Sequence, residues 1–247
     1  MLNFSDTSTL LGLLQRCEIF TGLGNGNITG DSTLKAHFTG LINDEYGSFV
    51  ADAIEADGRF QYDDSNHTKQ PAATFDLVAS QSTYNFITDE QGNQILRLGY
   101  ITIKDPEGNW INLTPIDISE FEKTGQAYDE FMETPSTPRY FDIQDGTGVR
   151  LFPAPNYNST GGGKVYFQRE PDYFTASDTT QKPGLPGFTH VGLAYGATAV
   201  WFLSKNDNRA DRFLEKRKEV RNQLIEFYSR RNRYEQPQII GVRRSAR

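Results

Sequence analysis

The sequence predicts an α+β fold in which helices from both ends of the chain form a four-helix unit and a mainly antiparallel β domain is inserted between them. Three observations support this prediction. Apolar residues recur at helical spacings in the N-terminal part and again after residue 187. Between residues 74 and 173 the apolar runs are short and separated by turn residues, as in strands. The length of 247 residues suits one large domain or one domain with an insertion.

The N-terminal part is predicted to hold two helices. The first extends from Ser8 to about Phe20, where several leucines cluster on one side. A glycine-rich breaker follows it, and Asp31 or Ser32 can cap the second helix. That helix ends at Gly58 and has the clearest helical periodicity of the chain, with an apolar side made of Leu34, Phe38, Leu41, Ile42, Phe49, Val50, Ala53 and Ile54. Because burying such a stripe requires partners, it predicts a helical bundle.

The middle of the chain is predicted to form the strands of the inserted domain. Lys104–Trp110 predicts a hairpin turn, because Pro106 suits its first central position and Gly108 can adopt a positive φ. One short helix is expected here: Asp117 caps it, Glu120 follows three residues later as in a capping box, and its apolar side comprises Ile118, Phe121 and Tyr128. The predicted strands are residues 74–80, 83–88, 95–103, 110–116, 140–145, 149–154 and 164–170.

The stretch from Gly146 to Pro171 is expected to form a β-hairpin, with its glycine-rich loop as the turn. In that arrangement Val149 and Leu151 pack across from Val165 and Phe167. The GGGK sequence in the loop looks like half of a phosphate-binding loop. The first glycine and the final hydroxyl of that motif are replaced here, however, and a strand follows instead of a helix.

Two further helices are predicted after the strands. Phe188–Leu203 is apolar nearly all round, which is typical of a buried helix, and Gly192, Gly196 and Ala197 permit close packing. The last helix extends from about Asn208 to Arg231 and carries its apolar residues on one face: Phe213, Val220, Leu224, Phe227 and Tyr228. The residues after it lack a helical period, and we expect them to be extended.

These elements predict four sections: N-terminal bundle helices at 1–70, an inserted β-rich domain at 71–175, C-terminal bundle helices at 186–232 and an extended basic tail at 233–247. The charge is divided unevenly among them. Residues 205–247 carry 13 Lys and Arg against 6 Asp and Glu, whereas the first 204 residues carry 12 against 26. The net charge of −7 therefore hides a basic C-terminal region, which suits either an oppositely charged partner or a solvated helix with a frayed end.

Residues that usually carry catalysis or bind metal are scarce in this sequence. Cys17 is the only cysteine, so a disulfide framework and a cysteine-based zinc site are excluded. His37, His67 and His190 share no spacing with one another or with acidic residues. We therefore expect no metal, no cofactor and no catalytic residue. The N-terminal residues lack the features of a signal peptide and no apolar run is long enough to span a bilayer, so we expect no contact with a membrane.

The basic C-terminus is the candidate binding site. Its members are Arg230, Arg231, Arg233, Ile239, Ile240, Val242, Arg243, Arg244 and Arg247. The arginines could bind nucleic acid in a salt-dependent way. The apolar members favour docking into an acidic groove of a partner protein instead, because a tail directed at DNA gains little from them. The acidic body of the chain also disfavours DNA binding.

Several motifs follow one another in an order known from one group of proteins. Thr137–Tyr140 precedes Val149–Pro155, a strand with alternating apolar residues and two prolines. A strand with aromatic and basic residues follows at Val165–Arg169, and an apolar helix follows at Leu185–Leu193. This order resembles the head–tail adaptor (head completion) proteins of tailed bacteriophages, in particular the tail tubular protein A family of short-tailed phages. The resemblance extends from about Leu34 to about Arg231, although the glycine of that family's first motif is missing here.

The resemblance implies a structural virion protein rather than an enzyme. Such proteins assemble as a ring of about twelve subunits at the head–tail junction, beneath the portal, and line the DNA channel. The implied partners are further copies of the chain, the portal protein, a tail or nozzle protein or tail fibres, and genomic DNA that passes without specific binding. The helical unit would contact the neighbouring subunits and the portal, the β insertion would face the tail, and the C-terminal tail would extend into the portal. The protein would be made in the cytoplasm of the bacterial host.

Two other functions stay open at this point. The first is a virion-associated protein that degrades carbohydrate or peptidoglycan, since the β-rich segment carries the carboxylates Asp142, Asp145, Glu170 and Asp172. A glycosidase needs two carboxylates at a defined separation. The second is a DNA-binding module that uses the basic residues between Arg230 and Arg247.

Overall fold

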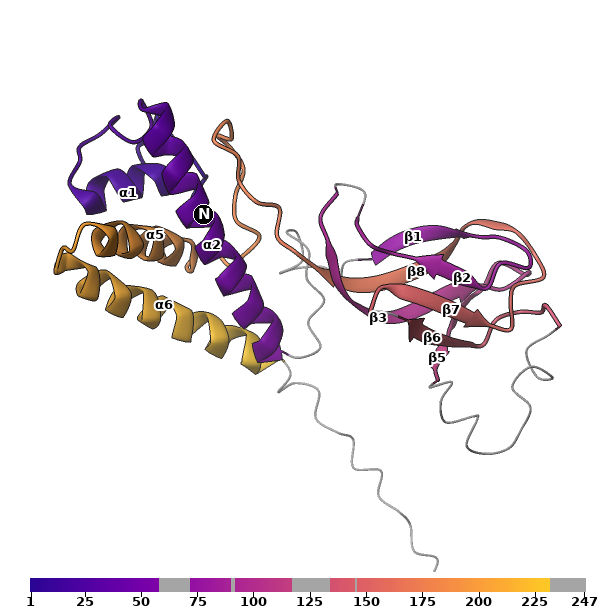
Figure 1. Cartoon of the computed structure of the whole chain (residues 1–247). Helices are drawn as coiled ribbons and strands as arrows, with labels where there is room; N and C mark the ends of the chain where they lie inside the picture. The colour runs from indigo at the N-terminus through magenta and orange to yellow at the C-terminus, as the bar shows by residue number, and fades with distance from the viewer. Residues whose placement is uncertain (58–71, 90–91, 117–133, 145, 232–247) are drawn as a thin grey trace, which may run out of the picture.

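The structure, a computed structural model, describes residues 1–57, 72–89, 92–116, 134–144 and 146–231. Helices from both ends of the chain lie together on one side of the molecule, and two β-sheets formed by the middle of the chain lie on the other (Figure 1). The predicted α+β class is therefore confirmed. The short helix expected after Asp117 lies outside the described residues.

The helical unit has its most apolar helix at its centre. Within the described residues it consists of α1 (Leu13–Thr21), α2 (Ser32–Asp57), α5 (His190–Ser204) and α6 (Arg209–Arg231). Helix α5 packs against each of the other three, which confirms its prediction as a buried helix. The core around it is closed by fully buried side chains that include Phe38, Ile42, Tyr46, Phe49, Leu193, Leu224 and Tyr228.

Helix α1 begins later than the sequence predicts, at Leu13 instead of Ser8. Asp6 caps a separate turn before the helix, in which its carboxylate accepts hydrogen bonds from the backbone N–H groups of Ser8 and Thr9 at 3.0 and 2.9 Å. This turn ends at Leu10, whose φ of 58° lies in the left-handed region that a right-handed helix cannot contain. The helix can therefore start only after Leu10.

The glycine-rich loop between α1 and α2 is held by a buried carboxylate. Glu18 of α1 is fully buried, and its Oε1 accepts hydrogen bonds from the backbone N–H groups of Ile28 and Thr29 at 3.0 and 2.8 Å. The Thr29 hydroxyl donates to the same oxygen at 2.9 Å. Of the two residues predicted as its cap, helix α2 uses Asp31, which accepts from the N–H groups of Thr33 and Leu34.

Two four-stranded sheets make up the β part. The first has the order β1-β8-β3-β4 and the second the order β2-β7-β6-β5, and all paired strands are antiparallel except β5 and β6. One apolar core lies between them, with buried side chains from both. The strands are β1 (Ala72–Leu77), β2 (Thr83–Asn85), β3 (Ile95–Lys104), β4 (Trp110–Asn112), β5 (Thr114–Pro115), β6 (Tyr140–Gln144), β7 (Gly148–Phe152) and β8 (Ser159–Arg169).

One predicted hairpin is confirmed and the other is wrong. Strands β3 and β4 pair through Lys104 and Trp110, and Gly108 in their turn has a φ of 87°. Strands β7 and β8, by contrast, belong to different sheets, so Gly146–Pro171 is not a hairpin. Prolines 153 and 155 follow β7 directly, and since proline has no N–H to donate, the chain leaves the ladder there.

The residues of the wrong hairpin still meet in the core. Val149 and Leu151 of one sheet and Val165 and Phe167 of the other are buried in the same cluster, so they pack face to face between the sheets. The glycines expected in the turn lie inside β8. A Cβ on Gly163 would stand 2.2 Å from the Phe75 ring, so glycine is needed there for the close approach of β1.

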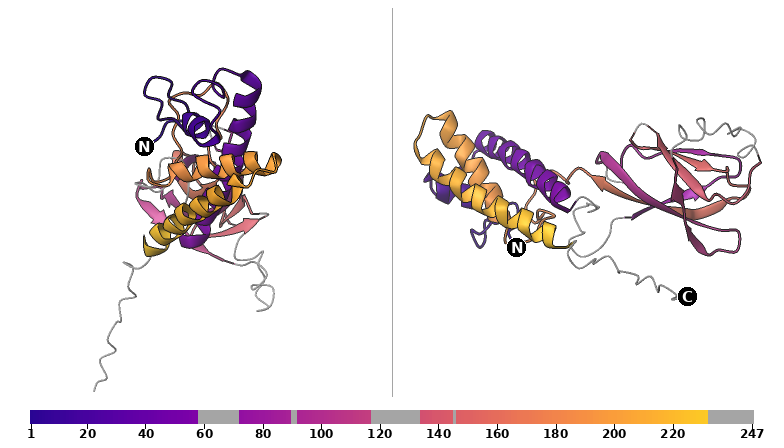
Figure 2. Two further views of the ribbon diagram at one scale, coloured as in Figure 1. Left: turned by 90° about the vertical axis from the view of Figure 1, so that its left-hand side faces the viewer. Right: turned by 90° about the horizontal axis from the view of Figure 1, so that it is seen from below.

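The segment that returns from β8 to α5 packs on the helical unit. Phe174 in this segment stacks on Phe4 with ring centres 4.5 Å apart, and Asn43 of α2 exchanges two hydrogen bonds with its backbone at 2.9 and 3.0 Å. The helical unit and the sheets lie end to end, as Figures 1 and 2 show. The molecule is therefore elongated, with two surfaces of different composition available to partners.

Candidate functional site

The structure describes only the start of the predicted binding tail. Arg230 is exposed on the last turn of α6 and forms an ion pair with Glu226, four residues earlier. Arg231 is the last residue of that helix. The other predicted members lie outside the described residues: Arg233, Ile239, Ile240, Val242, Arg243, Arg244 and Arg247. The tail therefore starts at the end of an exposed, charged helix.

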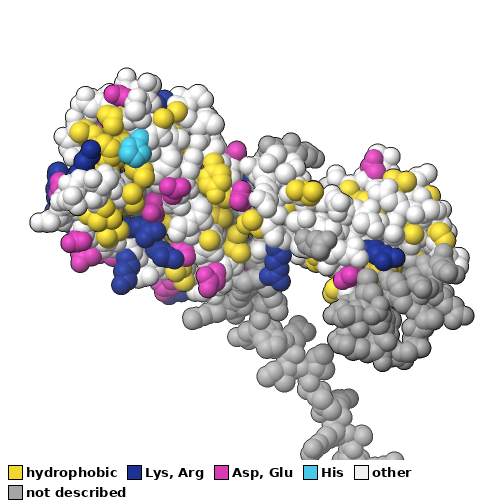
Figure 3. Space-filling view, in the orientation of Figure 1, with side chains coloured by type: hydrophobic (Ala, Val, Ile, Leu, Met, Phe, Trp, Pro, Cys, Tyr) yellow, Lys and Arg dark blue, Asp and Glu magenta, His cyan; other side chains and the backbone are white. Residues whose placement is uncertain are grey.

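Part of the basic charge of the C-terminal region is used inside the chain. Arg221 of α6 binds Asp52 of α2 through two hydrogen bonds, 2.5 Å from Nε to Oδ2 and 2.6 Å from Nη2 to Oδ1. Arg217 binds Glu45 of α2 at 2.5 Å. Part of the basic excess of the C-terminal region is therefore neutralised by carboxylates of α2, against which α6 packs. Figure 3 agrees, since basic and acidic side chains alternate over this part of the surface.

Glu45 is the most constrained carboxylate of this contact. It is buried between α2, α5 and α6, and a Cβ on Gly196 of α5 would lie 2.3 Å from its Cδ. Burial raises the pKa of Glu45, while Arg217 and Arg221 act in the opposite direction. Glu45 therefore locks three helices together and has no access to a substrate.

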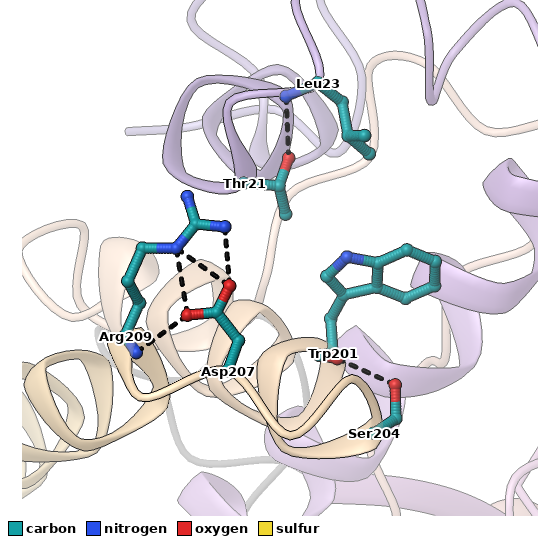
Figure 4. A network of polar contacts seen from close by, with 6 residues as sticks. All are labelled: Thr21, Leu23, Trp201, Ser204, Asp207 and Arg209. Carbon is teal, nitrogen blue, oxygen red and sulfur yellow. Dashed lines mark hydrogen bonds and ion pairs between the residues drawn. The ribbon is translucent and has the colours of Figure 1, made fainter.

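The corner between α5 and α6 exposes cations over aromatic rings. Asp207 caps α6 by accepting from the Arg209 N–H at 2.9 Å, and its carboxylate also binds the Arg209 guanidinium, so the pKa of Asp207 is lowered (Figure 4). The same guanidinium lies 4.3 Å from the centre of the Phe202 ring. Nearby, Lys205 Nζ lies 4.8 Å from the Trp201 ring centre. Such pairs suit contact with a protein surface.

Apolar side chains are also exposed around the helical unit. Phe188, which precedes α5, is 47% exposed and meets Phe227 of α6 edge to face, with ring centres 5.6 Å apart. Phe227 was predicted on the buried face of α6 but is 40% exposed, because it flanks that face. Other exposed apolar residues of the unit are Leu11, Ile19, Leu23, Val200 and Leu203. The sequence prediction named only residues of the C-terminal tail as a binding site. It did not include these exposed apolar residues or the cations Lys205 and Arg209.

The residues that could carry catalysis are not brought together. His190 is fully buried, its Nε2 lies 2.8 Å from the Leu185 carbonyl, and its Nδ1 lies 3.2 Å from the Leu2 N–H, so it holds the N-terminal segment in place. His37 lies on α2 beside Trp201. His67 lies outside the described residues. Burial raises the pKa of Cys17 to about 12, so its thiol is not a nucleophile at neutral pH.

The carboxylates of the glycosidase alternative lie in different elements. Asp142 is opposite Arg150 on strands β6 and β7, whereas Glu170 and Asp172 follow β8, and Asp145 lies outside the described residues. A groove of about 490 Å³ lies instead at the edge of the β part, where the carboxylate of Asp105 accepts from the Asn109 N–H at 2.7 Å. It is lined by Asp105, Glu107, Ile111, Asn112, Thr114, Thr137, Arg139 and Tyr140.

The described ranges hold no cluster of three or more His, Cys, Asp or Glu side chains that could bind a metal ion. Among these same residues, no helix combines the length and apolar character needed to cross a bilayer.

A family model described as "SU10 adaptor protein" matches residues 8–241, nearly the whole chain. This chain belongs to the SU10 adaptor protein family. The family is one of phage head–tail adaptors, which confirms the resemblance found in the sequence motifs and makes the chain a component of the virion. The comparison with curated proteins finds no match.

Proposed function

We propose that this adaptor is a non-enzymatic ring protein that joins the portal of the head to the tail and surrounds the DNA channel. The match of the adaptor family over residues 8–241 is the observation that carries the proposal. A ring of about twelve subunits, the number that the resemblance implies, needs two different surfaces on each subunit. The elongated shape, with helices at one end and sheets at the other, supports such an arrangement.

In the proposed assembly the helical unit contacts the neighbouring subunits and the portal. Exposed aromatic residues such as Phe188 and Phe227 are the type of side chain that dominates protein interfaces. The tail that starts after Arg231 inserts its arginines and its apolar residues into the portal, and the β part faces the tail or nozzle protein. The acidic charge of the chain reduces its attraction for the DNA that passes through the channel.

Co-sedimentation of the purified chain with its cognate portal tests this function. We expect a complex whose electron micrographs show a ring coaxial with the portal. In parallel, phage particles made without this protein should lose packaged DNA and lack attached tails. Unbound protein, or particles that keep both DNA and tails without it, would contradict the proposal.

The proposal also excludes a catalytic role. A cell-wall turnover assay with the purified chain should give no release above a buffer blank, and activity above the blank would favour the degrading alternative. For the DNA-binding alternative, gel shifts over a salt series should show no retained complex at physiological salt. Both measurements use the same preparation that binds the portal, so an inactive sample cannot explain a negative result.

A further inference from the structure

The outer face of the first sheet carries a compact set of aromatic and basic side chains. Side chains alternate along a strand, and the buried Ile101, Ile103 and Val165 point to the core. Their neighbours point outward, where β3, β4 and β8 lie side by side. We call this set the aromatic–lysine face; it consists of Tyr100, Lys104, Trp110, Lys164 and Tyr166.

Two lysines of this face are held over one tryptophan. Lys164 Nζ lies 4.2 Å and Lys104 Nζ 5.1 Å from the centre of the Trp110 ring. The ring attracts both ammonium groups and so limits their motion. Neither lysine forms an ion pair with a carboxylate of the described residues. The adjacent Asp105 is engaged in its own turn, where it accepts from Asn109.

The ring geometry of the face indicates what kind of molecule it binds. Tyr100 and Tyr166 stack on each other with ring centres 4.0 Å apart and planes at 19°. Trp110 has ammonium groups over its ring and is 41% exposed. A nucleobase binds a sheet by stacking on open ring faces, and these rings already have neighbours over a face. Tyr100 and Trp110 are partly exposed, and two lysines are held over Trp110. Such a combination of aromatic rings and cations suits contact with a protein surface that carries carboxylates.

Two carboxylates of the same chain lie where β8 leads back to the helical unit: Glu170 directly after β8, and Asp44 on α2. A Cβ on Gly47 of α2 would stand 2.9 Å from the Tyr173 hydroxyl, so this returning segment lies against α2. Tyr173, in the segment that returns from β8, is 40% exposed. Burial raises its pKa, and the nearby carboxylates of Glu170 and Asp44 raise it further. We call Asp44, Glu170 and Tyr173 the acidic patch. Neither carboxylate belongs to an ion pair among the described residues.

The acidic patch carries the carboxylates of Asp44 and Glu170, whereas the aromatic–lysine face carries the ammonium groups of Lys104 and Lys164. The two therefore differ in charge, and they lie on different elements: the face on β3, β4 and β8, and the patch on α2 and the segment that follows β8. Two complementary patches on one chain favour a head-to-tail contact between copies, which closes into a ring when the rotation allows it.

We propose that, in the ring, the aromatic–lysine face of one subunit binds the acidic patch of a second copy of this chain. This inference rests on the proposed ring and names two of the surfaces that build it. The contact is heterologous, because the same patch on both sides would place like charges against each other. The opposite charges orient the subunits as they meet, and the tyrosines and Trp110 supply the buried contact area.

A charge-exchange experiment tests the contact. The first variant is Lys104→Glu/Lys164→Glu and the second is Asp44→Lys/Glu170→Lys. Asp44 is exposed, and the other three residues are half-buried. Ring formation in the presence of the portal is followed by mass photometry as a function of protein concentration. Each variant alone should need about tenfold more protein to form rings, because like charges then face each other. The combined fourfold variant, which carries both exchanged patches, should assemble within about threefold of the wild type, because opposite charges then face each other again at every contact.

Controls separate this contact from effects of net charge and of folding. Arg97→Glu/Lys182→Glu changes the charge by the same amount as the first variant, at exposed residues outside both patches, and should assemble like the wild type. The milder Lys104→Gln/Lys164→Gln should weaken assembly in the same direction as the glutamates but less. Thermal unfolding of every variant shows that the fold is kept.

The outcomes distinguish failure of the proposed contact from failure of the proposed ring. Normal assembly of the first variant, or no recovery in the fourfold variant, overturns the inference and leaves the proposed ring intact. If the glutamate variant forms normal rings but no longer binds the tail protein, the acidic partner is that protein and the inference is wrong. A wild-type chain that forms no ring with the portal overturns both.

Discussion

At the scale of single residues, the helical unit depends on positions where small and charged side chains meet. Gly192 and Gly196 of α5 leave room for Phe49 and Glu45 of α2, and a Cβ at either position would stand within 2.8 Å of these side chains. Glu45 fills the space that Gly196 leaves and reaches Arg217 beyond it. The packing of the three helices therefore depends on two glycines, which leave space because they have no Cβ, and on the buried carboxylate of Glu45.

Replacing the helical glycines tests this packing. Gly196→Ala should lower the free energy of unfolding by about 1–3 kcal/mol, because the new methyl overlaps the Glu45 side chain. Gly40→Ala is the matched control on α2, where a Cβ meets nothing within 4 Å. It should leave stability unchanged or raise it by up to about 1 kcal/mol, because alanine favours helix. Urea unfolding measures both, and equal stabilities for the two variants would refute the packing role.

The pH dependence of a Glu45→Gln variant tests the burial of the carboxylate. Burial raises the pKa of Glu45 in the folded chain, so the fold favours the protonated form. The corresponding stability is complete below the unfolded pKa of about 4.5 and is lost as pH rises through the folded value. The Tm of the Gln variant should therefore improve relative to the wild type when pH rises from about 4 to 7.

The exposed Glu55→Gln on the same helix is the control for Glu45→Gln. Its Tm relative to the wild type should stay nearly constant over the same pH range, because that side chain keeps its contact with water. If the two variants followed the same pH curve, the assignment of the effect to burial of Glu45 would be wrong.

At the scale of elements, the helices end and begin where side chains satisfy their backbone groups. Asp31 starts α2 and Asp207 starts α6 at the sharp turn after α5, whereas the left-handed backbone of Leu10 keeps α1 from starting at Ser8. Strands behave differently, since their alternation shows which residues are buried but not which strand lies next to them. The placement of β7 and β8 in separate sheets is the clearest example.

Removing the Asp207 cap tests how α6 starts. Asp207→Ala should lower the Tm at neutral pH, because the Arg209 N–H and guanidinium lose their acceptor. The pKa of Asp207 is lowered in the fold, so its contribution is present above the usual value of 3.8 and is lost as pH falls below it. The difference in Tm between variant and wild type should therefore shrink in acid. Asp211→Ala, in the first turn but not at the cap, is the comparison.

At the scale of the whole molecule, the α and β parts have separate apolar cores. Each part can therefore present a different surface to a different partner. The predicted basic tail follows α6 in the sequence, and α6 ends on the side of the helical unit that faces the sheets (Figure 1).

Deleting the tail separates folding from docking. A chain that lacks Arg233–Arg247 should unfold at the Tm of the full chain, because the apolar core of the helical unit lies within the described residues and includes none of the deleted ones. Its binding to the portal should weaken, since the arginines and Ile239, Ile240 and Val242 are lost. Sedimentation with the portal measures this effect. A truncated chain that binds as tightly as the full one would show that docking uses the helical surface alone.

The sequence by itself determined the α+β class, the order of the described helices and the turn at Gly108, and it limited the cap of α2 to Asp31 or Ser32, because these follow from local spacing and side-chain chemistry. It predicted residues 110–116 as one strand, whereas the structure divides them between β4 and β5, which lie in different sheets. Only the tertiary structure decided that β7 and β8 lie in opposite sheets, that Arg217 and Arg221 pair with α2, and that the lysines of β3 and β8 meet over Trp110. Local periodicity reports whether a residue is buried, but contacts between residues far apart in the chain depend on how whole elements pack. The charge excess of the C-terminal region could be read from composition, whereas its partial neutralisation could be seen only once α2 and α6 were placed together.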